Sequence, residues 1–486
     1  MNSLVQQTAP SALSILQDHF CLIKLSNQIR ILERHEAQMI LDGQALGEIC
    51  FFERKDGELL MKRLLELQPI NCDVKKTIMD FWSHPNTHVY KNIAFAPWAT
   101  PPTTLNYWVG SLVKPVLGDW EVIKLHIKNV ICNGDLHLYE YLLNYLAHMI
   151  QYPGDKPGIM VVLLGKQGTG KGLFFEILKR IWPRSTLLVS DIQQVVGQFN
   201  ASLERNYVII MDEALFSGDR RSQDRMKSLI TEKSCHVEQK YQPSRTIDSV
   251  HRFFASSNHD QFAHVEADDR RYLFFRVSDK YQGNHFYFDR LSKAIDNDTV
   301  VAALAFELHN RNITGFNIRQ RPITDEHNEQ KLMSLEGFDR YWFEVLTAGR
   351  FGYSTYLGTT FDDCWTDSEF VATTQLLDFY QKHDKYSQKF KQTNSKDISD
   401  AISRLCPSAK KDRQSLKNNI KRGFHLPALS IARQEFERAY NLTIDWDDLA
   451  TGMNGSAVIE MDSPIWESEL ATFAMSCHVT WQLIPE

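Results

Sequence analysis

Residues 159–173 of the chain read IMVVLLGKQGTGKGL, and this stretch decides the fold. The apolar run 159–164 predicts a buried strand, and the residues from Leu173 to Trp182 predict a helix. The loop between them has the pattern GxxxxGK and consists of Gly165, Lys166, Gln167, Gly168, Thr169, Gly170, Lys171 and Gly172. A strand, a glycine-rich loop and a helix in this order predict a phosphate-binding loop, and with it a nucleotide-driven protein. An ordinary strand-to-helix turn is the alternative.

The residue types in this loop suit a triphosphate. Glycines let successive backbone N–H groups point at the phosphates, and the helix after the loop adds its positive N-terminal end. Lys171 supplies a cation for the β and γ phosphates. The next position is usually Ser or Thr, whose hydroxyl ligates Mg²⁺, but here it is Gly172. We therefore expect ATP and Mg²⁺ as cofactors, with the ion held by water and by a carboxylate elsewhere.

Two further apolar runs end in polar residues that suit ATP hydrolysis. Tyr207 to Met211 is followed by Asp212 and Glu213, about forty positions after the loop. We expect Asp212 to hold Mg²⁺ and Glu213 to orient and deprotonate the attacking water. A core strand that happens to end in a polar loop is the alternative. The run from His251 to Ser257 ends at Asn258, whose amide is placed to polarise that water or to contact the γ phosphate.

Arg270 and Arg271 precede a last apolar run, 272–277, and stand beside two acids. Taken alone, such a group indicates a surface ion-pair cluster as readily as a catalytic device. The whole order of phosphate loop, Asp-Glu strand, Asn strand and Arg-Arg strand resembles the superfamily 3 helicases. More closely, it is similar to the helicase part of primase-helicase proteins of phages, prophages and satellite elements. The GTGKG form of the loop and several flanking segments also resemble that family, namely 81–97, 106–108, 118–120, 126–135, 315–322 and 329–335.

This resemblance, which covers about residues 75–345, implies a hexameric ring that moves on nucleic acid with ATP bound between subunits. It implies that Arg271, or else Arg270, reaches the neighbouring site as an arginine finger. It also implies that a hairpin formed by 232–240 and 245–250 enters the ring channel. We expect phosphate contacts from its Lys240 and Arg245, with Tyr241 placed to stack on a base or to pack on a sugar. A solvent-exposed hairpin with incidental charges is the alternative.

Length and composition indicate a large protein without a membrane segment. The 486 residues exceed one hydrophobic core, so two to four domains are expected. The eight cysteines contain no CxxC pair, which argues against a zinc ribbon and for a reducing compartment. Residues 1–10 carry no basic charge, and no apolar run approaches about twenty residues. We expect the protein in the cytoplasm of a bacterial host.

The net charge of −6 hides a basic segment. Residues 382–422 contain twelve Lys and Arg against four acids, whereas residues 441–486 contain eight acids and no Lys or Arg. Helices are expected at 373–383 and 395–405, followed by a third helix or a strand pair at 410–420. This pattern suits a winged-helix-like DNA-binding module or the solvated face of a small bundle. Its expected DNA contacts are Lys410, Lys411 and Arg413, and its expected core is Phe390, Ile398, Ile402, Leu405, Leu416 and Ile420.

The N-terminal region is expected to be α+β, with a β-hairpin over 20–25 and 28–32 and a helix at 59–67. A second helix, 136–151, is expected to support the ATPase sheet. Residues 1–120 contain no paired-carboxylate segment that suits a primase, so any primase or polymerase is expected on another chain. The predicted fold is an α/β, AAA+-like P-loop core with a mostly helical C-terminal module. The expected ranges are an N-terminal accessory domain at 1–122, the ATPase at 123–345, the basic module at 346–427 and the acidic segment at 428–486.

The resemblance implies a ring-forming DNA helicase that acts in replication of a phage or mobile element, whereas the ATP site is predicted from the residues themselves. Two alternatives stay open. One is an initiator that uses ATP to assemble on origin DNA and melt it without processive unwinding. The other is a phosphotransferase that acts on a small molecule.

Overall fold

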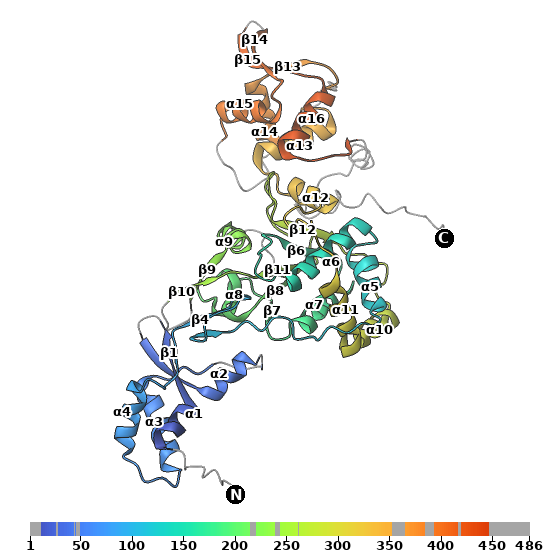
Figure 1. Cartoon of the computed structure of the whole chain (residues 1–486). Helices are drawn as coiled ribbons and strands as arrows, with labels where there is room; N and C mark the ends of the chain where they lie inside the picture. Colours follow the sequence, from blue (N-terminus) through green and yellow to red (C-terminus); the bar gives the residue numbers. More distant parts are fainter. Residues whose placement is uncertain are drawn as a thin grey trace, which may run out of the picture. The chain divides into compact units, whose positions relative to one another are not determined.

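The chain was analysed as a computed structural model that describes residues 11–25, 28–42, 44, 49–213, 220–238, 244–260, 262–351, 365–383, 393–416 and 419–446. It divides into two compact units (Figure 1). The first contains residues 1–262 and 270–324, and the second contains residues 263–269 and 325–486. The second unit thus contains the chain from Asp325 onward, and the N-terminal region falls in one unit with the central region. None of the helices in the described ranges is long and apolar enough to cross a membrane.

The N-terminal part of the first unit is α+β, as expected. Strands β1 (Phe20–Leu25) and β2 (Gln28–Glu33) form the predicted antiparallel hairpin, although its turn at 26–27 lies outside the described residues. The helix expected at 59–67 is present as α3, which begins before residue 59, at Arg54. The remaining elements of this part are α1 (Ala12–His19), α2 (Arg34–Leu41), α3 (Arg54–Glu66), α4 (Val74–Ser83), β3 (Val89–Tyr90), β4 (Asn92–Ala94) and β5 (Thr104–Asn106). A shared apolar core joins β1 to the helices and sheet further along the chain, which explains why the contacts define one unit.

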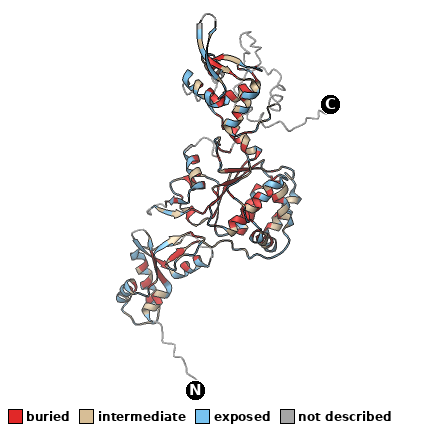
Figure 2. Ribbon diagram, turned by 45° about the horizontal axis from the view of Figure 1, so that its top comes forward, coloured by how far each residue is buried: buried red, intermediate tan, exposed pale blue. Residues whose placement is uncertain are grey.

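A five-stranded parallel sheet forms the centre of the first unit, in the order β12-β6-β11-β8-β7. Figure 2 shows β12, β6, β11 and β8 buried, because helices and loops cover both faces there, whereas Leu188 of the edge strand β7 is exposed. The predicted strands correspond to β6 (Met160–Leu164), β8 (Val208–Asp212), β11 (Arg252–Ser257) and β12 (Tyr272–Arg276), and β7 (Thr186–Val189) lies at one edge. The surrounding helices are α5 (Glu121–His126), α6 (Leu136–Gln151), α7 (Lys171–Ile181), α8 (Gln193–Val196), α9 (Arg220–Thr231), α10 (His285–Asp296) and α11 (Asp298–Asn310).

Two short helices and a hairpin complete the first unit. A π-helix, Ile127–Ile131, continues α5, and a 3₁₀-helix, Ala201–Arg205, precedes β8. The hairpin expected between the acid strand and the Asn strand is present as β9 (Ser234–Val237) and β10 (Arg245–Asp248). Its two strands are antiparallel, with Arg245 opposite Val237.

The second unit packs helices against a three-stranded sheet in the order β13-β15-β14. The segment 410–420 is a strand pair and not a helix, since Lys410–Leu416 pairs in antiparallel register with Asn419–Leu426. The fully buried Trp342 lies in the core with Ile398, Ile402 and Leu405, three of the expected core residues. The elements are α12 (Asp325–Met333), α13 (Gly337–Ala348), β13 (Glu369–Ala372), α14 (Thr373–His383), α15 (Ser395–Leu405), β14 (Lys410–Leu416), β15 (Asn419–Leu426) and α16 (Leu429–Tyr440).

Two expectations for this unit need correction. Ile420 was expected in the core but is 77% exposed. The hairpin of β14 and β15 extends beyond the helices (Figure 2). Burial among its described residues is therefore confined to its base, where Phe424 and Leu426 are covered. Helix α16 was assigned to the acidic segment, yet Ala432 and Phe436 on it are buried in the core of the unit. Phe390, the side chain of Leu416 and residues 447–486 lie outside the part of the chain that the structure describes.

Candidate functional site

The predicted phosphate loop, acids and asparagine meet at the carboxyl ends of the strands of the central sheet. Because β11 pairs in parallel with β6 and with β8, Ser257 lies opposite Leu164 and Ser256 lies opposite Asp212. The residues after these strands therefore emerge at the same edge, where ligands bind in open parallel sheets. They are the loop that begins at Gly165, the amide of Asn258 and the carboxylate of Glu213. The predicted phosphate loop, acids and asparagine are thus brought together by strand register.

Asn258 links the loop lysine to the acid strand. Lys171 Nζ donates to Asn258 Oδ1 at 2.7 Å, and Asn258 Nδ2 donates to Glu213 Oε1 at 2.5 Å. Lys171 Nζ also donates to the backbone carbonyls of Gly165 at 2.6 Å and Lys166 at 2.9 Å. Burial lowers the pKa of Lys171, and the carboxylates of Asp212 and Glu213 partly oppose this shift. The ammonium is therefore held folded onto its own loop, with three oxygen partners.

These groups line a cleft of about 420 Å³, which is within the range of small-ligand sites. Its lining comes from the loop, from the ends of β8 and β11 and from α10, and it consists of Gln167, Gly168, Thr169, Gly170, Lys171, Gly172, Leu173, Asp212, Glu213, Asn258 and Phe288. Helix α7 begins at Lys171, so its unpaired N–H groups face the cleft and favour an anion there. A Cβ built on Gly172 would meet nothing within 4 Å, so the position has space for a side chain and lacks only the hydroxyl.

The two acids differ in their backbone and in their partners. Asp212, the last residue of β8, accepts a hydrogen bond from the Ser256 hydroxyl on the neighbouring strand. Glu213 has a φ of 56°, in the left-handed region that non-glycine residues seldom adopt. Such a conformation costs on the order of 1–3 kcal/mol and is found mostly where a side chain must point in one direction. Here it directs the Glu213 carboxylate toward Asn258.

Sequence reasoning missed a buried histidine beneath the loop. His126 is fully buried, its Nε2 lies 3.2 Å from the Gly170 carbonyl, and its Nδ1 lies 3.0 Å from the Tyr287 hydroxyl. Burial lowers the pKa of His126 to about 4, so the ring is neutral. Nε2–H therefore donates to Gly170 and Nδ1 accepts from Tyr287. A Cβ at Gly170, whose φ is 98°, would lie 2.6 Å from the His126 ring, so this loop position must be glycine.

The two arginines do not line this cleft. In the parallel register of β12 with β6, Tyr272 lies opposite Met160, and Arg276 lies opposite Leu164. Arg271 therefore precedes β12, at the end of the strand away from the loop. The five residues of β12, at about 3.3 Å each, place Arg271 roughly 16 Å from that loop. Arg270 is exposed and Arg271 is partly buried. Neither can act on a ligand in the cleft of its own chain.

The predicted DNA contacts of the β9–β10 hairpin are only partly described. Lys240 and Tyr241 lie outside the described residues. Arg245 is described, and its guanidinium forms a two-bond ion pair with Glu204 of the 3₁₀-helix, with Nε 2.6 Å from Oε1. Arg245 pairs with Val237 next to the loop that joins β9 to β10, and Glu204 is buried, so this ion pair fixes the loop end of the hairpin. The phosphate contact expected of Arg245 stays a prediction, and in this structure its guanidinium is held by Glu204.

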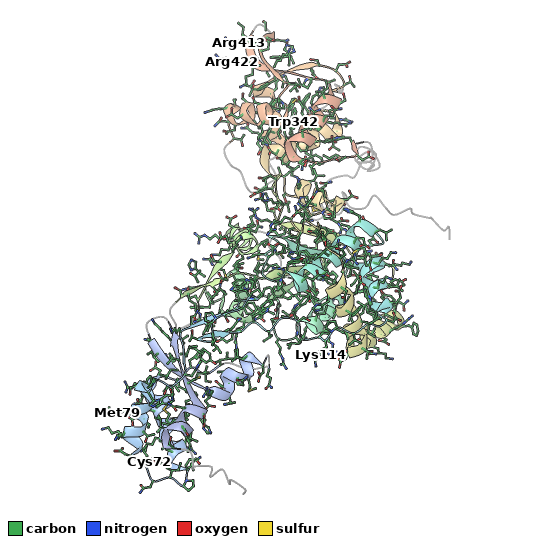
Figure 3. The ribbon with its side chains drawn as sticks, in the orientation of Figure 1. Cys72, Met79, Lys114, Trp342, Arg413 and Arg422 are labelled. Carbon is green, nitrogen blue, oxygen red and sulfur yellow. The ribbon has the colours of Figure 1, made fainter. Side chains whose placement is uncertain are left out.

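The basic C-terminal segment concentrates its charge on the β14–β15 hairpin. Arg404 on α15 is neutralised by Asp339, with Nη2 2.5 and 2.7 Å from the two carboxylate oxygens, and Lys382 pairs with Asp378. In contrast, the hairpin cations form no ion pair among the residues the structure describes; these are Lys410, Lys411, Arg413, Lys421 and Arg422. Arg413 and Arg422 are direct cross-strand partners, and Figure 3 shows both on the hairpin.

Comparison with known proteins finds similarity between part of this chain and a phage primase-polymerase. A family of unknown function (DUF5906) matches residues 163–271, which include the loop, the acids and Asn258. The chain is 28% identical over 165 residues to the DNA primase-polymerase of Nitratiruptor phage NrS-1. That alignment covers 33% of this chain and 22% of the phage protein, so the match spans about a fifth of the length of the relative.

Solved structures of the NrS-1 C-terminal region share the fold. The A-form apo structure aligns with a TM-score of 0.59 and 14% identity, over 85% of this chain and 98% of the solved chain. A second apo structure of the same region aligns with a TM-score of 0.56, over 86% of this chain and all of the solved chain. These structures therefore confirm the predicted mixed α/β class of the fold.

The neutral state of His126 predicts a pH dependence of stability. Its pKa is about 4 in the folded protein and about 6.5 when exposed, so below pH 6.5 the unfolded chain binds a proton that the folded chain does not. Stability is therefore lost as the pH falls from 6.5 to 4, by up to about 1.4 kcal/mol per pH unit. His126→Gln should show a smaller slope of unfolding free energy against pH in denaturant titrations, whereas His137→Gln, at an exposed site, should not. An unchanged slope for His126→Gln would contradict the assignment.

Proposed function

We propose that the chain is an ATP-dependent DNA helicase of the superfamily 3 type that acts in the replication of a phage or mobile genetic element. The observation that carries this proposal is the hydrogen-bonded series Lys171, Asn258 and Glu213 at the carboxyl edge of the sheet. It joins a phosphate-binding cation to a carboxylate suited to deprotonate water, through an amide that contacts both. The similarity to a phage protein named a DNA primase-polymerase supports a role in replication.

The cleft fits a nucleoside triphosphate with Mg²⁺. Mg²⁺ keeps several waters in nucleotide sites and takes one or two carboxylates together with the substrate phosphates. Asp212 and Glu213 supply such a pair, and no cluster of three or more His, Cys, Asp or Glu suited to a protein-only metal site occurs among the described residues. Asp212 would hold the ion, which neutralises phosphate charge when bound. Because Gly172 lacks a hydroxyl, the coordination shell of Mg²⁺ would be completed by water.

In the hydrolysis step, Glu213 orients and deprotonates the attacking water, and Lys171 turns from its loop carbonyls to the β and γ phosphates.

Hydrolysis in this proposal requires a second subunit. In the sheet order β12-β6-β11-β8-β7, the Asn258 strand separates the loop strand from the acid strand, as in AAA+-like ATPases. Arg271 lies at the opposite edge of the sheet, where it would reach the cleft of a neighbouring subunit in a ring. Each cleft would then be completed by the arginine of the next chain. We propose a hexamer in which ATP lies between subunits, with any primase or polymerase on another chain.

The second unit supplies a candidate DNA contact. The order α13, β13, α14, α15, β14, β15, with the sheet order β13-β15-β14, is the arrangement of a winged helix. Its wing is the β14–β15 hairpin, with five cations among its described residues. Arg413 and Arg422 face each other across the strands, and like charges in this position destabilise a sheet. A phosphate between them relieves this repulsion, so the wing is suited to a nucleic-acid backbone.

The exposed wing also favours a second candidate function, an initiator that binds duplex origin DNA and melts it. Both functions need the same ATP site, so they differ in the DNA step that hydrolysis drives. A helicase separates a forked substrate whose duplex is longer than the bound site. An initiator opens only the DNA that it covers.

The first test separates nucleotide binding from hydrolysis. Lys171→Ala should abolish ATP binding, because it removes the cation that faces the phosphates. Glu213→Gln should bind ATP but fail to hydrolyse it, because the amide keeps the shape of the carboxylate and cannot accept the proton. Equilibrium binding and phosphate release measure both effects. Lys179→Ala, on the exposed side of the same helix, is the control. Near-normal hydrolysis by both site variants would show that the assigned site is wrong.

The second test concerns the shared site. Arg271→Ala should bind ATP normally and lose hydrolysis by on the order of 10³- to 10⁵-fold, as expected for an arginine finger. Mixing Arg271→Ala subunits with Lys171→Ala subunits should restore part of the activity, because some interfaces then combine an intact loop with an intact arginine. Hydrolysis is measured over a range of mixing ratios. Full activity of Arg271→Ala alone would exclude this role.

The third test concerns the wing. The double variant Arg413→Ser, Arg422→Ser should bind duplex DNA more weakly, and the slope of log affinity against log salt should fall by about 1.8 for two lost phosphate contacts. ATP hydrolysis without DNA should be unchanged, because the wing is not part of the cleft. Lys382→Ala removes a cation that is already paired on α14 and serves as the control. An unchanged salt slope would argue against DNA binding by the wing.

A further inference from the structure

The cleft has two chemically different ends. Asp212 ends β8, and Glu213 and Asn258 follow β8 and β11, on one side of the loop strand β6. Helix α10 comes after β12, which flanks β6 on the other side, and it places Phe288 in the lining. Apart from Leu173 at the start of α7, Phe288 is the one large apolar side chain among the described lining residues. The cleft is therefore polar at one end and apolar at the other.

The Phe288 ring is held against the phosphate loop. A Cβ on Gly170 would lie 3.0 Å from Phe288 Cε1, so the edge of the ring reaches the loop backbone. Phe288 packs edge-on against Tyr287, with ring centroids 5.1 Å apart, and Tyr287 stacks flat on Tyr281 at 4.0 Å and 3°. The Tyr287 hydroxyl is in turn fixed by His126. Each of these contacts restricts the ring, so Phe288 is presented to the cleft as a preorganised apolar surface.

We infer that Phe288 is the surface on which the nucleobase of the bound nucleotide stacks, with Leu173 as the neighbouring wall. The inference rests on the proposed function. The γ phosphate must lie at Glu213 and Asn258 for water to be activated there, so the sugar and base extend toward the opposite, apolar end. A planar base has a π face that suits an aromatic ring, and stacking of one base on one aromatic side chain contributes about 1–3 kcal/mol.

This placement gives Phe288 a role that depends on the base and not on the phosphates. The loop, Lys171 and the N-terminus of α7 bind the triphosphate, and Phe288 adds affinity only when a base is attached. Stacking requires no hydrogen bond from the protein, so it accepts purines and pyrimidines alike and favours the larger purine ring. The substrate class is thus a nucleoside triphosphate recognised by its phosphates and by the flat face of its base.

The test compares ATP with inorganic triphosphate, which has the same phosphates and no base. Phe288→Ala should weaken ATP binding about 5- to 150-fold, which corresponds to about 1–3 kcal/mol, and should leave triphosphate binding unchanged. Phe288→Leu keeps an apolar side chain of similar size for packing, and it should show the same selective loss because it lacks the aromatic face. Phe288→Tyr should bind ATP as the unaltered protein does. Titration calorimetry of the full chain with Mg²⁺ measures all four proteins.

Phe286→Ala is the matched control, because Phe286 lies on the same helix, is 80% exposed and does not line the cleft. It should bind both ligands normally. An equal loss of ATP and triphosphate binding in Phe288→Leu would overturn the inference, since the ring would then only support the loop, and it would leave the proposed function intact. Unchanged ATP binding in Phe288→Ala would also overturn the inference. If the unaltered chain bound neither ligand, the proposed function would fail together with the inference.

Discussion

The parallel pairing of β11 with both β6 and β8 is the constraint on which the cleft depends. It fixes where three separate segments leave the sheet, and so it brings a loop cation, an amide and a carboxylate within hydrogen-bonding distance. Because β11 lies between β6 and β8, the side chain of Asn258 after it can contact groups from both neighbouring strands. Because Asn258 lies between Lys171 and Glu213, the proposed movement of the lysine toward a phosphate would change the hydrogen bonding of the acid as well. Binding of a phosphate in the loop would thus be coupled to the orientation of the acid through one side chain.

Supporting residues on one side of the loop hold it in shape without using its ligand-binding groups. His126 fixes the Gly170 carbonyl from beneath, Lys166 pairs with Asp279 at 2.8 Å, and Gln282 donates to the Gln167 carbonyl at 2.8 Å. Carbonyl oxygens are thereby turned toward protein donors, which lets the N–H groups face the cleft. A loop fixed in this way is preorganised for an anion, so less ordering entropy is lost on binding.

Local patterns in the sequence were sufficient to predict four of the five strands of the central sheet and the positions of the glycine-rich loop and the acids, because apolar runs that end in polar residues are a short-range signal. The edge strand β7 was not predicted. These patterns did not predict His126 or Phe288, whose roles arise from contacts across 44 and about 120 residues. For Phe288, the one feature of the sequence that could have indicated a role was the run of three aromatic residues, 286–288, after β12. The ion pair of Arg245 with Glu204 was not predicted, because charge alone does not identify the partner. Ile420 was wrongly placed in the core, because the sequence does not tell how far the helices cover the β14–β15 hairpin.

The central claim is that this cleft couples ATP hydrolysis to nucleic acid, and one measurement tests it most directly. The rate of ATP hydrolysis by the unaltered chain is determined with and without single-stranded DNA, and the mass of the assembled species is determined in the same solutions. The account predicts slow hydrolysis by the chain alone, and faster hydrolysis when DNA is added to an assembled ring. Hydrolysis that is unaffected by DNA, from a species with the mass of one chain, would contradict it.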